Sequence, residues 1–165
     1  MNFFHYEVPP TAGLPLHLSD FFPSAHSLEA KLSQFIGTHN VQIECSATSA
    51  LVVALTSLKN LSPKKKVIIS AYTCPWVPIA IIHCGLMPVV CDSNNKHFDF
   101  NLKKLESILN DDVLAIIPTH LAGKIADVKK ILPLAKKYGA FVIEDGAQAL
   151  GARTKKQSVG LLGDI

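Results

Sequence analysis

Residues 67–91 read VIISAYTCPWVPIAIIHCGLMPVVC and contain no Asp, Glu, Lys or Arg. A stretch of this length is long enough to span a bilayer. However, three prolines and Gly85 divide it into two apolar runs with a helix-length segment between them, and each piece has the length of a core element. We therefore predict a strand, a helix and a strand inside a protein core, and no membrane-spanning segment.

The same alternation of apolar runs and helical segments extends outward in both directions. The predicted strands are Val41–Cys45, Lys66–Ala71, Met87–Cys91, Val113–Pro118 and Ala140–Glu144. The predicted helices are Thr48–Lys59, Trp76–Cys84, Leu102–Leu109 and Ile125–Tyr138, the last bent at Pro133. Because the strands are apolar throughout, helices must cover both faces of the sheet. Repeated strand–helix units then predict an α/β fold with a parallel, doubly wound sheet.

Before this alternation, the chain begins with an aromatic and proline-rich segment. We predict that residues 1–23 form an extended arm, because they show no sustained period. A helix follows, capped at its start by Ser24 or Ser27 and ended by Gly37. Residues 24–165 are expected to form one partial domain.

The composition excludes several classes of protein. The 165 residues are 48% hydrophobic and carry a net charge of +3, and Arg153 is the only arginine. A nucleic-acid reader normally needs several arginines, so we expect no nucleic-acid partner. The four cysteines form no CxxC pair and the histidines no HxxxH pair, so we expect neither a metal site nor a disulfide framework. The start has no signal-peptide pattern, and we expect a cytoplasmic protein.

Ligands of such sheets bind beyond the carboxyl ends of the strands. At the first of these ends, residues 45–51 read CSATSAL and lead into a helix. Free backbone N–H groups and the hydroxyls of Ser46, Thr48 and Ser49 make this junction a candidate anion site. A plain Ser/Thr helix cap is the alternative.

Two other strand ends carry titratable side chains. Asp145 follows a buried strand, where a carboxylate needs a partner such as a protonated ring nitrogen. A helix cap is the alternative for Asp145. His120 ends the preceding strand and is a candidate catalytic residue, with a hydrogen-bonded core histidine as the alternative. No GxGxxG or GxxxxGK[ST] motif is present, which argues against a generic nucleotide-binding domain.

Taken together, these segments resemble the DegT/DnrJ/StrS aminotransferases, the nucleotide-sugar branch of the fold-type I pyridoxal-phosphate enzymes. The most specific segments are EDGAQALGA at 144–152 and VGLLGD at 159–164. PTHLAG at 118–123 and GLMPVVCD at 85–92 fall at the family's spacing. The resemblance covers nearly the whole chain, and it implies the large domain of that fold, cut before its last strands and its C-terminal domain.

The resemblance also implies roles for individual residues in binding pyridoxal 5′-phosphate (PLP). Ala47 and Thr48, next to Ser46, would hold the phosphate. Asp145 would pair with the pyridine nitrogen and keep it protonated, so that the ring accepts electrons. Gln148 would form a hydrogen bond near the phenolic oxygen.

Where many members carry a stacking aromatic, this chain has Cys74. Trp76 or Tyr72 could stack on the ring in its place, or the thiol could pack on the ring.

In the family, the lysine that forms the Schiff base follows the motif that ends here at Gly163-Asp164. We therefore expect that lysine beyond Ile165, and neither Lys155 nor Lys156 has the right position to replace it. Some relatives carry histidine there and act as dehydratases, an alternative that stays open.

The resemblance implies transfer of an amino group from a glutamate-like donor to a nucleotide-linked keto-sugar, carried out by a homodimer. Without the lysine we expect this chain alone to be inactive, and to associate with a second copy or with a missing C-terminal part. The alternative from another class is a non-catalytic binding or interaction relic.

Overall fold

A computed structural model describes residues 17–22, 27–155 and 157–165. Its centre is a sheet of four parallel strands in the order β2-β1-β5-β6. The strands are β1 (Lys66–Ser70), β2 (Met87–Cys91), β5 (Val113–Ile117) and β6 (Phe141–Val142). The predicted parallel α/β sheet is confirmed, and three of its strands lie within one residue of their predicted bounds.

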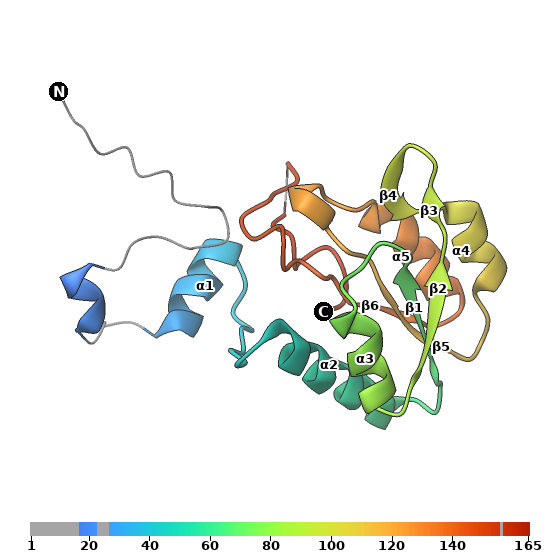
Figure 1. Ribbon diagram of the computed structural model, residues 1–165, viewed down its shortest axis with the longest axis horizontal. Coiled ribbons are helices and arrows are strands. Elements are labelled where there is room, and N and C mark those ends of the chain that lie inside the picture. Colours follow the sequence, from blue (N-terminus) through green and yellow to red (C-terminus); the bar gives the residue numbers. More distant parts are fainter. Residues whose placement is uncertain (1–16, 23–26, 156) are drawn as a thin grey trace.

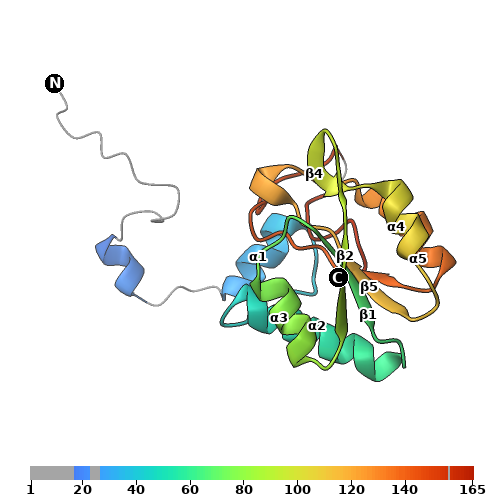
Figure 2. The same ribbon diagram turned by 45° about the vertical axis from the view of Figure 1, so that its right-hand side comes forward.

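Helices cover both faces of this sheet, as Figure 2 shows with the sheet nearly edge-on. One face carries α2 (Ala47–Leu61) and α3 (Trp76–His83), and the other carries α4 (Leu102–Ile108) and α5 (Val128–Lys137). Successive residues of β1 serve opposite faces, because strand side chains alternate. Val67 packs in the core under α2 and α3, whereas Ile68 packs in the core under α4 and α5. This two-sided burial explains why the strand is apolar at every position except its ends.

The order of the strands creates a switch point between β1 and β5. The chain moves from β1 to β2 in one direction, and from β5 to β6 in the other. Crevices for ligands form at such points, outside the carboxyl ends of the strands. The loops that leave β1 and β5 meet there, with the hydroxyl oxygens of Thr73 and Thr119 3.1 Å apart.

The N-terminal elements are short. A 3₁₀ turn, η1 (Leu18–Phe21), precedes α1 (Leu28–Ile36). The Ser27 hydroxyl caps α1 by accepting the Ala30 N–H at 3.2 Å, and Gly37 ends it with a φ of +90°. Ser24 lies outside the described residues, as does most of the predicted arm over residues 1–23.

Two small elements were not predicted. The loop after β2 contains a hairpin of β3 (Ser93–Asn94) and β4 (His97–Phe100), visible at the top of Figure 1. A 3₁₀ turn, η2 (Leu121–Gly123), follows β5. Both are too short for a periodic sequence pattern to reveal them.

Three predicted elements differ in the structure. Residues Val41–Cys45 form no strand, because no other described strand lies beside them to provide hydrogen bonds. The last helix begins at Val128 rather than Ile125. The strand predicted at Ala140–Glu144 is assigned only at Phe141–Val142.

The segment after β6 nevertheless continues to pair beyond the assigned strand. Ile165 donates its N–H to the Val142 carbonyl at 3.2 Å, and its own carbonyl accepts the Glu144 N–H at 2.8 Å. These two bonds follow the pattern of parallel strands. Among the helices of the described residues, none combines the length and apolar character that a bilayer span requires.

Candidate functional site

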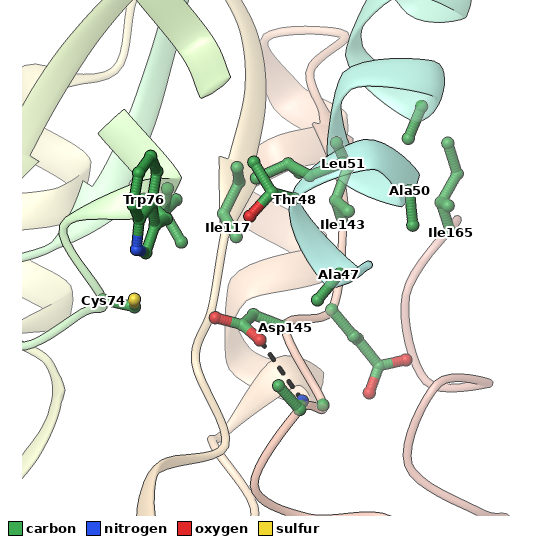
Figure 3. A pocket seen from close by; sticks show the side chains of 15 residues that line it. Ala47, Thr48, Ala50, Leu51, Cys74, Trp76, Ile117, Ile143, Asp145 and Ile165 are labelled. Carbon is green, nitrogen blue, oxygen red and sulfur yellow. Dashed lines mark hydrogen bonds between the residues drawn. The ribbon is translucent and has the colours of Figure 1, made fainter. Parts of the chain in front are cut away.

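A pocket lies at the switch point, between the N-terminal ends of α2 and α3 and the carboxyl ends of β5 and β6 (Figure 3). Its volume is about 330 Å³, within the range of roughly 300–1,000 Å³ typical of small-molecule sites. Five of the predicted cofactor-binding residues line it: Ala47, Thr48, Cys74, Trp76 and Asp145. The structure thus brings together residues from three separate segments of the sequence.

The N-terminal end of α2 presents unpaired donors to this pocket. The Ser46 hydroxyl accepts the Ser49 N–H at 3.1 Å, and the Ser49 hydroxyl in turn accepts the Ser46 N–H, which completes a capping box. The N–H groups of Ala47 and Thr48 have no partner among the described residues. These two N–H groups, the Thr48 hydroxyl and the helix dipole therefore suit an anion such as a phosphate.

Asp145 presents a carboxylate to the same pocket. Its Oδ1 accepts the Ala147 N–H at 3.3 Å, and its other carboxylate oxygen has no partner among the described residues. In Figure 3 the Asp145 carboxylate and the Thr48 hydroxyl face the space beside Trp76 and Cys74. A cationic hydrogen-bond donor bound beside Asp145 would pair with the carboxylate oxygen that has no hydrogen bond from the protein.

The remaining walls are largely apolar. Leu51, Ile117 and Ile143 supply the floor between the two polar ends. Trp76 is 60% exposed at the rim and offers an aromatic face to a flat ring. Tyr72, the other predicted stacking candidate, instead packs on Phe98 with ring centroids 4.7 Å apart. Of the two aromatic candidates, the structure brings only Trp76 to the pocket.

Two predicted cofactor-binding side chains are engaged outside the pocket lining. The Ser46 hydroxyl serves the cap of α2, as its alternative interpretation states. The Gln148 side-chain oxygen accepts the Ala122 N–H at 2.8 Å and so holds η2. Gln148 is therefore a brace for the loop after β5 in this structure.

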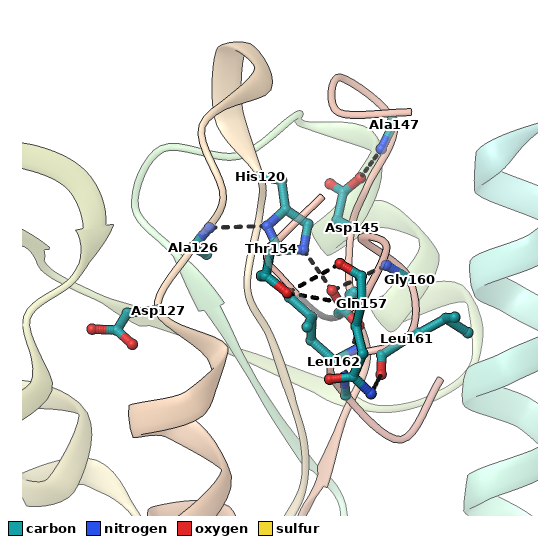
Figure 4. A network of polar contacts seen from close by, with 12 residues as sticks. His120, Ala126, Asp127, Asp145, Ala147, Thr154, Gln157, Gly160, Leu161 and Leu162 are labelled. Carbon is teal, nitrogen blue, oxygen red and sulfur yellow. Dashed lines mark hydrogen bonds and ion pairs between the residues drawn. The ribbon is translucent and has the colours of Figure 1, made fainter. Parts of the chain in front are cut away.

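His120 lies behind the pocket rather than in it. Its side chain is 0% exposed, and its Nε2 lies 2.8 Å from Glu144 Oε2. Its Nδ1 accepts the Ala126 N–H at 2.9 Å (Figure 4). With both ring nitrogens paired, His120 matches the hydrogen-bonded core histidine that was its alternative, and the structure does not bring it to the ligand space.

Glu144 is the residue that sequence reasoning missed. Its buried carboxylate accepts four hydrogen bonds, one from His120 and three from backbone N–H groups of Gly160, Leu162 and Gly163. Burial raises the pKa of this carboxyl, but the bonds from His120 and the three amides outweigh that effect, so its pKa lies below its usual value. A charged acid next to Asp145, followed by a glycine-rich segment, was the signal available in the sequence.

The pocket can be tested against PLP by the chemistry of its donors. A phosphate fits the free N–H groups of α2, a protonated pyridine nitrogen fits Asp145, and a flat ring fits the apolar walls beside Trp76. The residues present therefore fit the phosphate, the ring and the ring nitrogen. Within the described residues, no lysine lines the pocket to hold the aldehyde.

Comparison with known proteins connects this geometry to a family. The sequence profile described as the DegT/DnrJ/EryC1/StrS aminotransferase family matches residues 17–165. A UDP-N-acetyl-3-dehydro-alpha-D-glucosamine 3-aminotransferase of Acidithiobacillus ferrooxidans is 36% identical over 139 residues, which is 84% of this chain and 37% of that protein. The spore coat polysaccharide biosynthesis protein SpsC of Bacillus subtilis is 32% identical over 142 residues, which is 86% of this chain and 36% of that protein.

Solved structures give the same result for the fold. The PMP-form of the putative sugar aminotransferase Spr1654 from Streptococcus pneumoniae superposes with a TM-score of 0.77 at 28% identity. The match covers 82% of this chain and 38% of that structure. The chain thus spans little more than a third of the length of the relatives it matches.

Proposed function

Because this chain belongs to the DegT/DnrJ/EryC1/StrS aminotransferase family, we propose that its pocket is the PLP-binding part of a sugar aminotransferase. The observation that carries the proposal is the pairing of two open groups in one pocket. Unpaired N–H groups at the start of α2 and an under-coordinated Asp145 carboxylate match the two charged ends of this cofactor.

In this proposal, each residue has a defined task. Ala47 and Thr48 bind the phosphate through their N–H groups and the Thr48 hydroxyl. Asp145 holds a proton on the pyridine nitrogen. Trp76 would stack on the ring, and the Cys74 thiol would pack beside it. When bound, the cofactor supplies an electron sink for the carbon that gains or loses the amino group.

The complete enzyme of which this chain represents a part would move an amino group from a glutamate-like donor to a nucleotide-linked keto-sugar. The described chain offers no lysine at the pocket, so we propose that the 165 residues alone bind the cofactor without catalysing transfer. A second copy or a separate C-terminal part would supply the missing groups. The apolar side of α3 supports such an association, because Ile79 and Ile82 are exposed there.

Cysteine alkylation provides a test with an internal control. Cys45 and Cys74 are both exposed, but only Cys74 lines the pocket. Pyridoxamine 5′-phosphate, which needs no lysine aldehyde bond, should slow alkylation of Cys74 by iodoacetamide several-fold and leave Cys45 unchanged. Peptide mass spectrometry measures both rates in one sample. Equal rates at Cys74 with and without saturating ligand would refute the assignment of the pocket.

Borohydride reduction tests the claim that the chain lacks the covalent lysine. After PLP is added and reduced, intact mass should show no stoichiometric adduct. A single adduct that disappears when Lys155 and Lys156 are both replaced by alanine would contradict the claim.

A further inference from the structure

The buried His120–Glu144 pair adjoins Asp145: Glu144 precedes Asp145 in the chain, and the His120 N–H donates to the Asp145 carbonyl at 3.0 Å. We propose that this pair is a positioning device, which fixes the direction of the Asp145 carboxylate toward the ring nitrogen of the bound cofactor. The inference rests on the proposed function. It assigns an indirect role to His120 and Glu144, because neither side chain contacts the ligand.

The hydrogen bonds of His120 select a single protonation form of its ring. Nδ1 accepts the Ala126 N–H at 2.9 Å, so that nitrogen carries no proton. Nε2 must then carry the proton and donate it to Glu144 Oε2 at 2.8 Å. A ring with two fixed partners and no exposed surface cannot rotate without breaking both bonds.

Glu144 is held as firmly as His120. A carboxylate has about four lone-pair positions, and here each receives a donor. Oε2 accepts His120 and Gly160, the latter at 3.1 Å, while Oε1 accepts Leu162 and Gly163, the latter at 2.7 Å. Although Glu144 borders the pocket, its side chain is 0% exposed and its carboxylate has no position left for a ligand.

The fixed side chain of Glu144 determines where Asp145 points. Successive side chains of extended chain point to opposite sides, so anchoring Glu144 inward turns Asp145 toward the pocket. The backbone of Asp145 is clamped as well: its carbonyl accepts the His120 N–H at 3.0 Å, and its N–H donates to the Pro118 carbonyl at 2.9 Å. His120 thus holds Asp145 through its backbone and Glu144 through its ring, which closes a small loop of interactions.

Asp145 depends on this support because its own side chain has little. Its only hydrogen bond among the described residues is the 3.3 Å contact with the Ala147 N–H. Such a long bond does not fix a carboxylate, whereas the pairing of a carboxylate with a ring cation needs its position held to within about half an ångström. A displacement of Glu144 would therefore move Asp145 away from the ring nitrogen before it affected the phosphate end of the pocket.

The test compares two ligands on the same protein. Pyridoxamine 5′-phosphate carries the ring nitrogen, and its 1-deaza analogue carries a C–H group in that position. Dissociation constants of both are measured by titration calorimetry for the full 165-residue chain. The unaltered chain should prefer the nitrogen-containing ligand roughly 10- to 100-fold, the range expected for a charge-assisted hydrogen bond. A fraction of unfolded protein lowers both affinities equally, so this ratio does not respond to stability alone.

Three variants and one control complete the design. Asp145→Asn should abolish the preference, and Glu144→Gln and His120→Phe should each reduce it to about threefold or less. Ile131→Ala removes a fully buried side chain from the core under α5, with a stability loss in the same range, and should keep the full preference.

The outcomes separate the two levels of the proposal. If the preference is lost in Asp145→Asn but kept in Glu144→Gln and His120→Phe, the positioning role is wrong and the proposed function stands. If the unaltered chain binds neither ligand, or binds both equally, both proposals fall.

If the variants do not fold, ¹⁵N NMR of the unaltered chain tests the positioning role by reporting which ring nitrogen of His120 carries the proton. A His120 ring protonated at Nε2 alone supports the positioning role, and interconverting tautomers overturn it.

Discussion

Replacing Glu144 by glutamine should destabilise the fold strongly without changing the size of the side chain. The carboxylate accepts four hydrogen bonds, but a glutamine offers one oxygen and turns an NH₂ group toward the other donors. At least two bonds to a charged acceptor are therefore lost. Each contributes about 1.5–3 kcal/mol, so we expect Glu144→Gln to lower the free energy of unfolding by about 3–6 kcal/mol.

Urea unfolding followed by circular dichroism measures this loss, and Glu106→Gln is the matched control. Glu106 forms a solvent-exposed pair with Lys137 at 3.8 Å, so the same chemical change there should alter stability by less than about 0.5 kcal/mol. If Glu144→Gln and Glu106→Gln have equal effects, the buried network does not stabilise the fold and our reasoning is wrong.

The effect of Glu144 should also depend on pH. Its pKa in the folded protein lies below the ordinary value of 4.5, so the charged form stabilises the fold at any pH above that value. As the pH falls below about 4.5, the unfolded chain takes up the proton first and the stabilisation declines. The difference in stability between the unaltered chain and Glu144→Gln should therefore be largest at neutral pH and shrink in acid.

Three further predictions concern separate parts of the fold. Ser46→Ala removes the cap of α2 and should lower the free energy of unfolding by about 1 kcal/mol in urea titrations. Gly163→Ala would place a Cβ 2.7 Å from a backbone oxygen, that of Val142, and should lower the thermal midpoint with a loss of about 1–3 kcal/mol. Burial, with the nearby charge of Asp92, raises the pKa of the Cys91 thiol to about 11, so iodoacetamide at pH 8 should modify this cysteine far more slowly than Cys74, as peptide mass spectrometry can show.

The sheet could be predicted because its signals are local. β1 and β5 are apolar at consecutive positions, which is the sequence pattern expected of a strand that is buried on both faces. The carboxyl ends of parallel strands share one edge, so Cys74 after β1 and Asp145 after β6 could be expected in one pocket, whereas Thr48 reaches that pocket from a segment that is not a strand.

What could not be predicted depends on partners distant in the sequence. Val41–Cys45 has the composition of a strand, but a strand exists only where another strand pairs with it. The task of Gln148 likewise depends on the position of Ala122, which the sequence pattern around Gln148 does not reveal. His120 and Glu144 are 24 residues apart, and only the fold brings the two side chains together.

The contact between His120 and Glu144 also has an evolutionary consequence. A substitution at position 120 alone leaves a buried acid short of a donor, and a substitution at position 144 alone leaves the imidazole and three amides without their acceptor. Either single substitution would therefore produce an intermediate sequence that folds poorly. We therefore expect the two positions to change together across descendants of this sequence, or not to change at all.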